Sequence, residues 1–179
     1  MFGIALRYGV ISGAFILGVI VLGIVLSRDH ANGGFFSSEY FGYLVMLVAL
    51  STIFLAIRDY RNQQLGGVIK FLPALGLGLM IAAIAGIAYV VAWEIYLNAT
   101  NYQFMNHYAA AMTERARAAG LTGPALQAKL AQIEEMRAGY SNPLIRLPMT
   151  FLEIFPVGVL IALISAALLR NPKVLPARA

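Results

Sequence analysis

The strongest constraint in this sequence is a set of four long apolar runs, each about as long as a helix must be to cross a membrane. They cover residues 4–26, 40–57, 71–97 and 147–169. A hydrocarbon core about 30 Å thick takes roughly 20 apolar residues of helix. Because unpaired backbone polar groups are not tolerated in lipid, each run is expected to be helical. The sequence therefore predicts an all-α protein built on a four-helix transmembrane bundle.

Composition supports this class and removes several others. The chain is 60% hydrophobic and 12% charged, whereas a soluble domain is about half apolar and a quarter charged. Cysteine is absent and the histidines are His30 and His107, so a disulfide framework is excluded and a Cys/His zinc site has too few ligands. The net charge of +5 is spread over the ends of the apolar runs. This favours membrane lipids as partners over nucleic acid, and no motif predicts a cofactor.

Lysine and arginine near the ends of the runs predict the orientation. The first run is longer than the roughly 7 to 15 residues of a signal-peptide core, and "SRDHANGG" after it has no A-x-A site, so we expect an uncleaved anchor. On one predicted side of the membrane, basic residues are concentrated in short segments at the ends of the runs. This side is therefore predicted to be cytoplasmic. They are Arg7, Arg58, Arg61, Lys70, Arg170, Lys173 and Arg178. Those on the other side are more dispersed: Arg28, Arg115, Arg117, Lys129, Arg137 and Arg146. Both termini are therefore predicted to be cytoplasmic.

The segment 98–146, between the third and fourth runs, is too long for a plain connection and should have structure of its own. Its first half is rich in helix formers and is expected to end at Gly120, unless it simply continues the third span. Its second half offers Thr122 as a cap, Pro124 in the first turn and Gly139 as a terminator. The result is an extramembrane helical hairpin. Its apolar faces either pack only on each other or leave a surface for a partner or lid.

Small residues recur every four positions in three of the runs and predict close helix packing. They are Ala74, Gly78, Ala82 and Gly86 in the third run, Gly158, Ala162 and Ala166 in the fourth, and Gly9 and Gly13 in the first. We expect the third and fourth spans to pack closely. These ridges either build the bundle of a single chain or form an interface between subunits.

Two glutamates, Glu94 and Glu153, lie in the apolar runs at comparable depth near the outer side. A charge at a helix centre costs roughly 2.5 to 3.5 kcal/mol on insertion scales, so it normally faces the bundle or water. The carboxylates can share a proton, bind a cation, or leave one of them to pair with Arg146, two turns before Glu153. We expect a polar site between the outer ends of the third and fourth spans. A purely structural ion pair is the alternative.

A basic collar is predicted at the cytoplasmic ends of the spans, around the turn "IRDYRNQQLGGVIKF". Its members are Arg7, Arg58, Arg61, Lys70 and Arg170. Such a collar can bind anionic lipid headgroups or phosphates, or it can serve only as a topology determinant beside a turn. The Gly-Gly pair is not a P-loop, since the G-x-x-x-x-G-K-[ST] spacing is missing.

Three stretches resemble a known family. They are "GYLVMLVALSTIFLAIRDYRNQQLGGVIKF", the third run through "WEIY", and "YSNPLIRLPMTFLEIFPVGVLIALISAALLR". Together they are similar to a bacterial family of small four-span membrane proteins classed as a domain of unknown function. The resemblance implies a single membrane domain over residues 1–179, a large loop before the last span and a place in the bacterial inner membrane. It implies no activity and no catalytic residue.

The sequence favours a non-catalytic membrane module that self-associates or serves a membrane partner protein, since no constellation of nucleophile, base and orienting group is present in it. The alternative is a small proton- or cation-linked transporter that uses the outer carboxylate pair. Against it, the chain shows no inverted repeat and no paired broken helices. A membrane enzyme ranks third.

Overall fold

The computed structural model describes residues 1–27 and 39–176, and every element in these ranges is a helix. Arg28, His30 and Arg178, named above, lie outside the described residues. The chain divides into two units, which we call the bundle unit (Met1–Trp93 with Phe151–Ala179) and the hairpin unit (Glu94–Thr150). Each is described by itself.

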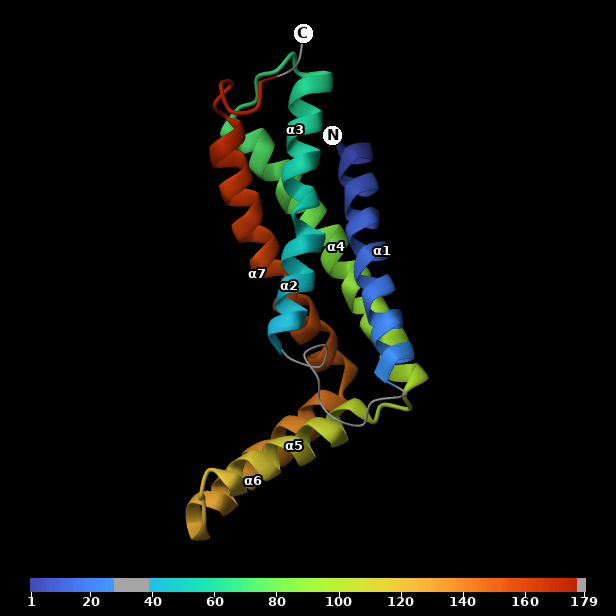
Figure 1. The fold of residues 1–179 in the computed structure, drawn as a ribbon, viewed down its shortest axis with the longest axis vertical. Helices are drawn as coiled ribbons and strands as arrows, with labels where there is room; N and C mark the ends of the chain where they lie inside the picture. The colour runs from blue at the N-terminus through green and yellow to red at the C-terminus, as the bar shows by residue number, and fades with distance from the viewer. Residues whose placement is uncertain (28–38, 177–179) are drawn as a thin grey trace. The chain divides into compact units, whose positions relative to one another are not determined.

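The bundle unit contains the apolar helices. These are α1 (Phe2–Ser27), α2 (Glu39–Leu50), α3 (Thr52–Gln64), most of α4 (Phe71–Ala99) and most of α7 (Pro143–Leu169). Four helical stretches, with α2 and α3 counted together, are long and apolar enough to cross a membrane. The predicted all-α fold with four such helices is confirmed. Figure 1 shows the start of α1, the end of α3, the start of α4 and the end of α7 at one end of this bundle.

The second apolar stretch runs further than its hydrophobic pattern. Its helix continues to Gln64, seven residues beyond the predicted end at residue 57, because the polar residues after it break no helix until Gly66. Gly66 and Gly67 then take positive φ values of 61° and 91°, which glycine adopts without steric cost. The charged residues of "IRDYRNQQ" are therefore helical and carried on one rigid element.

A one-residue interruption at Ser51 separates α2 from α3. Hydroxyl groups surround the backbone there: both Thr52 and Ser12 donate to the carbonyl of Ala49, at 2.8 and 3.0 Å. The hydroxyl oxygens of Ser12 and Thr52 are also 2.5 Å apart. In a membrane, a loosened helix needs such partners for its carbonyls. These bonds tie α1 to the interrupted helix.

The third and fourth apolar stretches, α4 and α7, pack through their small residues. A Cβ added at Gly78 would lie 2.7 Å from the Cβ of Ala162, and one added at Gly158 would lie 2.6 Å from the Cβ of Ala82. Contacts this short leave no room for a side chain, so the two backbones approach closely. The predicted packing of these helices is confirmed.

The GxxxG pair of α1, Gly9 and Gly13, packs against α4. Added Cβ atoms at Gly9 and Gly13 would lie 2.6 Å from Cγ2 of Ile84 and 2.3 Å from the Cβ of Ala88. Helix α4 therefore packs against both α1 and α7. The ridges named from the sequence are thus used inside a single chain.

The hairpin unit contains α5 (Phe104–Ala118) and α6 (Gly123–Ser141), which lie side by side in Figure 1. Its apolar contact is small: Met105, Ala109 and Ala116 of α5 and Ile133 of α6 are the buried residues of these two helices. The unit also includes the end of α4 and the start of α7. The hairpin expected between the third and fourth spans is therefore present.

The break before α5 answers one question that the sequence left open. Asn101 and Tyr102 have φ values of 51° and 55°, in the left-handed region that L-residues rarely adopt. A helix cannot pass through two such residues, so α5 does not continue α4. Gly120, with φ of 78°, follows the end of α5 as predicted.

The prediction that Gly139 terminates the second hairpin helix is wrong, because α6 continues to Ser141. The stop is set by the next two residues. Asn142 precedes Pro143 and has φ of −84° and ψ of 116°, the extended conformation that a following proline imposes. Pro143 then occupies the first position of α7, where its missing N–H costs nothing.

Candidate functional site

The most elaborate polar arrangement in the hairpin unit surrounds Arg146, in the first turn of α7. Its side chain is only 5% exposed. Nε donates to Oε1 of Glu94 at 2.7 Å, and Nη2 donates to Oε2 at 2.9 Å. This two-pronged contact is the strongest geometry available to an arginine and a carboxylate. Of the arrangements expected for the glutamates, an ion pair with Arg146 is present for Glu94.

The remaining face of the Arg146 guanidinium is occupied by the chain around it. Nη1 donates to the carbonyl of Tyr140 at 3.1 Å and to that of Ser141 at 3.4 Å. The guanidinium carbon lies 5.3 Å from the ring centre of Tyr102 and 5.9 Å from that of Tyr140, within the range of cation–π attraction. We call Arg146, Glu94, Tyr102 and Tyr140 the arginine knot. It joins the ends of α4 and α6 to the start of α7.

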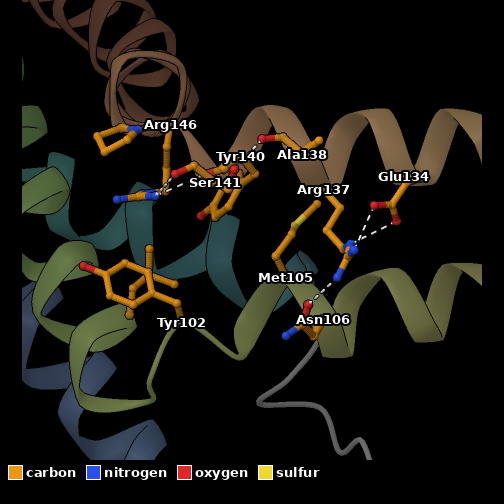
Figure 2. Close-up of a pocket in the computed structure, with 11 residues that line it drawn as sticks. Tyr102, Met105, Asn106, Glu134, Arg137, Ala138, Tyr140, Ser141 and Arg146 are labelled. Carbon is orange, nitrogen blue, oxygen red and sulfur yellow. Dashed lines mark hydrogen bonds and ion pairs between the residues drawn. The ribbon is translucent and has the colours of Figure 1, made fainter.

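A cavity of about 550 Å³ adjoins the arginine knot (Figure 2). Its lining combines aromatic, apolar and charged side chains: Leu97, Tyr102, Met105, Asn106, Glu134, Arg137, Ala138, Tyr140, Ser141, Pro143 and Arg146. At the end away from Arg146, Arg137 of α6 donates to Glu134 at 2.8 and 3.0 Å and reaches Asn106 of α5 at 3.1 Å. Each of the two lining arginines therefore already has a carboxylate.

The two ion pairs of this region differ in burial. Arg137 and Glu134 are 46% and 63% exposed, so water screens their pair. The hydrogen bond from Arg137 lowers the pKa of Glu134 below its ordinary value, and Glu134 raises the pKa of Arg137. The lining contains no histidine, cysteine or lysine, and the described part of the chain holds no cluster of three metal-ligating side chains.

Glu153, the second predicted carboxylate, belongs to the bundle unit. It lies on the surface of that unit, where the hydroxyl of Tyr89 donates to its Oε2 at 3.2 Å. Tyr89 is itself buried, 7% exposed. Glu94 is in the other unit, and a joint site of Glu94 and Glu153 stays a prediction.

The basic collar lies in the bundle unit. Arg7, Lys70 and Arg170 are exposed and Arg58 is half-buried, but Arg61 is completely buried. It faces inward because the last carbonyls of α7 lack partners within their own helix. Nη1 of Arg61 donates to the carbonyls of Leu169 at 3.3 Å and of Val174 at 2.8 Å, and Nη2 donates to that of Leu175. Arg61 therefore differs from the headgroup contact expected from the sequence.

The sequence matches the family described as "Protein of unknown function (DUF4199)" over residues 7–171. The chain belongs to this family. The match includes all four apolar stretches and the hairpin, and the resemblance to a domain of unknown function is confirmed. No curated protein and no solved structure matches. Membership of the DUF4199 family assigns this protein no activity.

Sequence reasoning missed several of these contacts in this DUF4199 protein. Tyr140 was not singled out, although an aromatic residue six positions before a buried arginine can return to it across the turn at Pro143. The hydroxyl of Tyr8 in α1 donates to Asp59 in α3, and neither residue was expected to form a contact. A tyrosine and an aspartate near the same end of two spans were the available signal.

Proposed function

We propose that this protein is a non-catalytic membrane module that associates through its extramembrane hairpin, with a second copy of itself or with a membrane partner protein. The observation that supports this most is the arginine knot. It fixes the base of the hairpin with a buried charge pair, two carbonyls and two aromatic rings. A hairpin held in this way loses little conformational freedom when it binds.

The hairpin surface is suited to a polar, specific contact. Glu114 pairs with Arg117 on α5 and Glu134 with Arg137 on α6, all with more than 45% of the side chain exposed. Both signs of charge are therefore displayed on both helices. Patterns of this kind set partner choice and orientation more than they set affinity.

The location proposed for the module is the bacterial inner membrane, with both termini in the cytoplasm and the hairpin on the other side. Because the chain has no cysteine, single cysteines can report this directly. A membrane-impermeant maleimide added to intact cells should label a cysteine at Ala128 and spare one at Gln64, both exposed positions. The reverse pattern would refute the orientation.

Association is tested by energy transfer between labelled copies. Donor and acceptor dyes are placed on a cysteine at Ala128, and the full chain is reconstituted in phosphatidylcholine vesicles at falling protein density. Transfer that persists on dilution, and that weakens when Glu94→Gln loosens the base of the hairpin, supports self-association. Glu114→Gln, in an exposed pair, is the matched control and should leave the transfer unchanged.

Association with a different protein is tested in native membranes. A photoreactive residue at Ala128 should give one defined adduct, and the same probe at Gln64 should not give it. If transfer falls to the level of randomly placed copies and no adduct depends on the hairpin position, the proposal is refuted.

A proton- or cation-linked transporter is the second candidate, and the bond from Tyr89 to Glu153 in an apolar helix pair is what favours it. Vesicles holding the reconstituted protein and a pH-sensitive dye should then show a proton flux driven by a potassium diffusion potential. Glu153→Gln should abolish that flux. A flux that Glu153→Gln leaves intact, or no flux at all, would exclude this role for the carboxylate.

A further inference from the structure

The basic collar contains an unusual pair of charges on α3, Arg58 and Arg61, three residues apart and therefore on neighbouring faces of the helix. Arg61 is completely buried. All its acceptors are neutral. They are the backbone carbonyls of Leu169, Val174 and Leu175, at and after the end of α7, and Oδ1 of Asn62 at 2.8 Å. Among the described residues no carboxylate lies within ion-pair distance of it. Within the described residues, the buried positive charge is therefore solvated by dipoles and has no carboxylate partner.

Arg58 adds a buried hydrogen-bond donor without an acceptor among the described residues. That donor is its Nε. A buried donor without a partner costs about 1 to 3 kcal/mol, so a water molecule or an anion that accepts this hydrogen would stabilise the protein. Arg58 therefore directs an unused charge-bearing donor into this end of the bundle.

The neighbouring carboxylate, Asp59, forms no ion pair with either arginine among the described residues. Asp59 follows Arg58 in the sequence, but it accepts the hydroxyl hydrogen of Tyr8 from α1. The bonds from Arg61 to the end of α7 place Arg170, which follows Leu169, beside the end of α3. Lys70 directly precedes α4 and Arg170 directly follows α7, and Figure 1 shows the start of α4 and the end of α7 at the same end of the bundle. Both residues are exposed and add positive charge there.

We propose that the basic collar binds the oxyanion of a phosphate group, with Arg58 as the principal donor and the exposed Arg170 and Lys70 completing the site. Phosphate fits these donors because an arginine fork binds two of its oxygens at once. It also fits the position, at the ends of membrane-spanning helices, where lipid phosphates lie. The source is a phosphate ester of an anionic lipid or free inorganic phosphate. This inference does not depend on the association of the hairpin.

The test measures the thermal midpoint of the full chain in a neutral detergent. Short-chain phosphatidylglycerol, short-chain phosphatidylcholine and inorganic phosphate are titrated separately, at constant ionic strength set with chloride. Phosphatidylglycerol should raise the midpoint of the wild type by about 4 °C near saturation, and phosphatidylcholine should not. A matching rise with inorganic phosphate identifies free phosphate as a ligand, and a rise with phosphatidylglycerol alone identifies a lipid headgroup.

Arg58→Gln removes the fork and should abolish the rise. Arg58→Lys keeps the charge and should restore part of it. Arg117→Gln, on the exposed surface of the hairpin, is the matched control and should keep the full rise. If Arg58→Gln does not fold, the double variant Lys70→Gln/Arg170→Gln, with both changes at exposed positions, should lose at least half of the rise. An equal rise with phosphatidylcholine, no rise, or a full rise in the variants would overturn the proposal.

Discussion

Two buried arginines, one in each unit, solve the same physical problem differently. Arg146 in the hairpin unit meets a carboxylate, two carbonyls and two aromatic rings. Arg61 in the bundle unit meets three carbonyls and an amide oxygen. In the first case the charge is cancelled within the chain. In the second, no carboxylate in the described part of the chain pairs with the charge, which is solvated by dipoles.

The difference indicates which region is complete in itself. Removing a guanidinium from water costs several kcal/mol, and a well-placed carboxylate returns most of that cost. Carbonyl dipoles return part of it but leave a net positive charge. The arginine knot is therefore a closed structural joint, whereas the basic collar remains attractive to an anion. This contrast supports a structural role for the first and a binding role for the second.

The largest expected effect concerns the close helix packing of the bundle unit, which contains Arg61. Replacing Gly78 and Gly86 by leucine should destabilise the protein by about 2 to 6 kcal/mol, since each change overpacks a tight contact. Added Cβ atoms would lie 2.7 Å from Ala162 and 2.7 Å from the ring of Phe151. Chemical unfolding in detergent measures the loss. Gly18→Leu is the control, because nothing lies within 4 Å of its added Cβ, and equal losses in both proteins would show that the close packing is not needed.

The next effect concerns the hairpin unit, where the charge of Arg146 is paired with Glu94. Glu94→Gln should destabilise the protein by about 3 kcal/mol, because it leaves the charge of Arg146 buried without a carboxylate. Glu114→Gln removes an exposed pair with Arg117 and should cost less than about 1 kcal/mol. Thermal unfolding of the two variants side by side measures the difference. Similar losses would mean that the knot is no stronger than a surface ion pair.

The contacts of Arg61 in the bundle unit are tested by Arg61→Lys, which keeps the charge but lacks the guanidinium fork that reaches several carbonyls. We expect a loss of about 1 to 2 kcal/mol, from hydrogen bonds that are no longer made. A spin label on a cysteine at Lys173 should become more mobile in this variant, since the segment after α7 loses its contact with α3. Unchanged mobility would show that Arg61 does not hold that segment.

The smallest effect concerns the exposed pair beside the cavity. Arg137 lowers the pKa of Glu134, so the stability that the pair contributes is present above the ordinary glutamate pKa of about 4.3 and is lost as the pH falls through the lower folded value. Arg137→Gln should return the carboxylate to its ordinary pKa. Titration followed by carboxyl-carbon NMR measures both proteins. A Glu134 that titrates alike in both would remove this pair from the account.

Hydrophobic patterning predicted the spans well, because their length and composition are set by the membrane and not by distant contacts. The ends of helices were harder to predict. Gly139 looks like a helix terminator, but Pro143 decides where α6 ends. The two arginines illustrate what can and cannot be predicted. Arg146 was named as a candidate partner from its spacing, whereas Arg61 resembled an ordinary charge at the end of a span. Its inward direction depends on the carbonyls of α7, more than a hundred positions later in the chain.

The measurement that tests the contrast most directly is native mass spectrometry of the full chain, released from nanodiscs of mixed phosphatidylglycerol and phosphatidylcholine. The account predicts that the wild type and Glu94→Gln both retain phosphatidylglycerol, and that Arg58→Gln loses it. Retention that disappears in Glu94→Gln and survives in Arg58→Gln would place the open charge at Arg146, and would contradict the assignment of the anion to the basic collar.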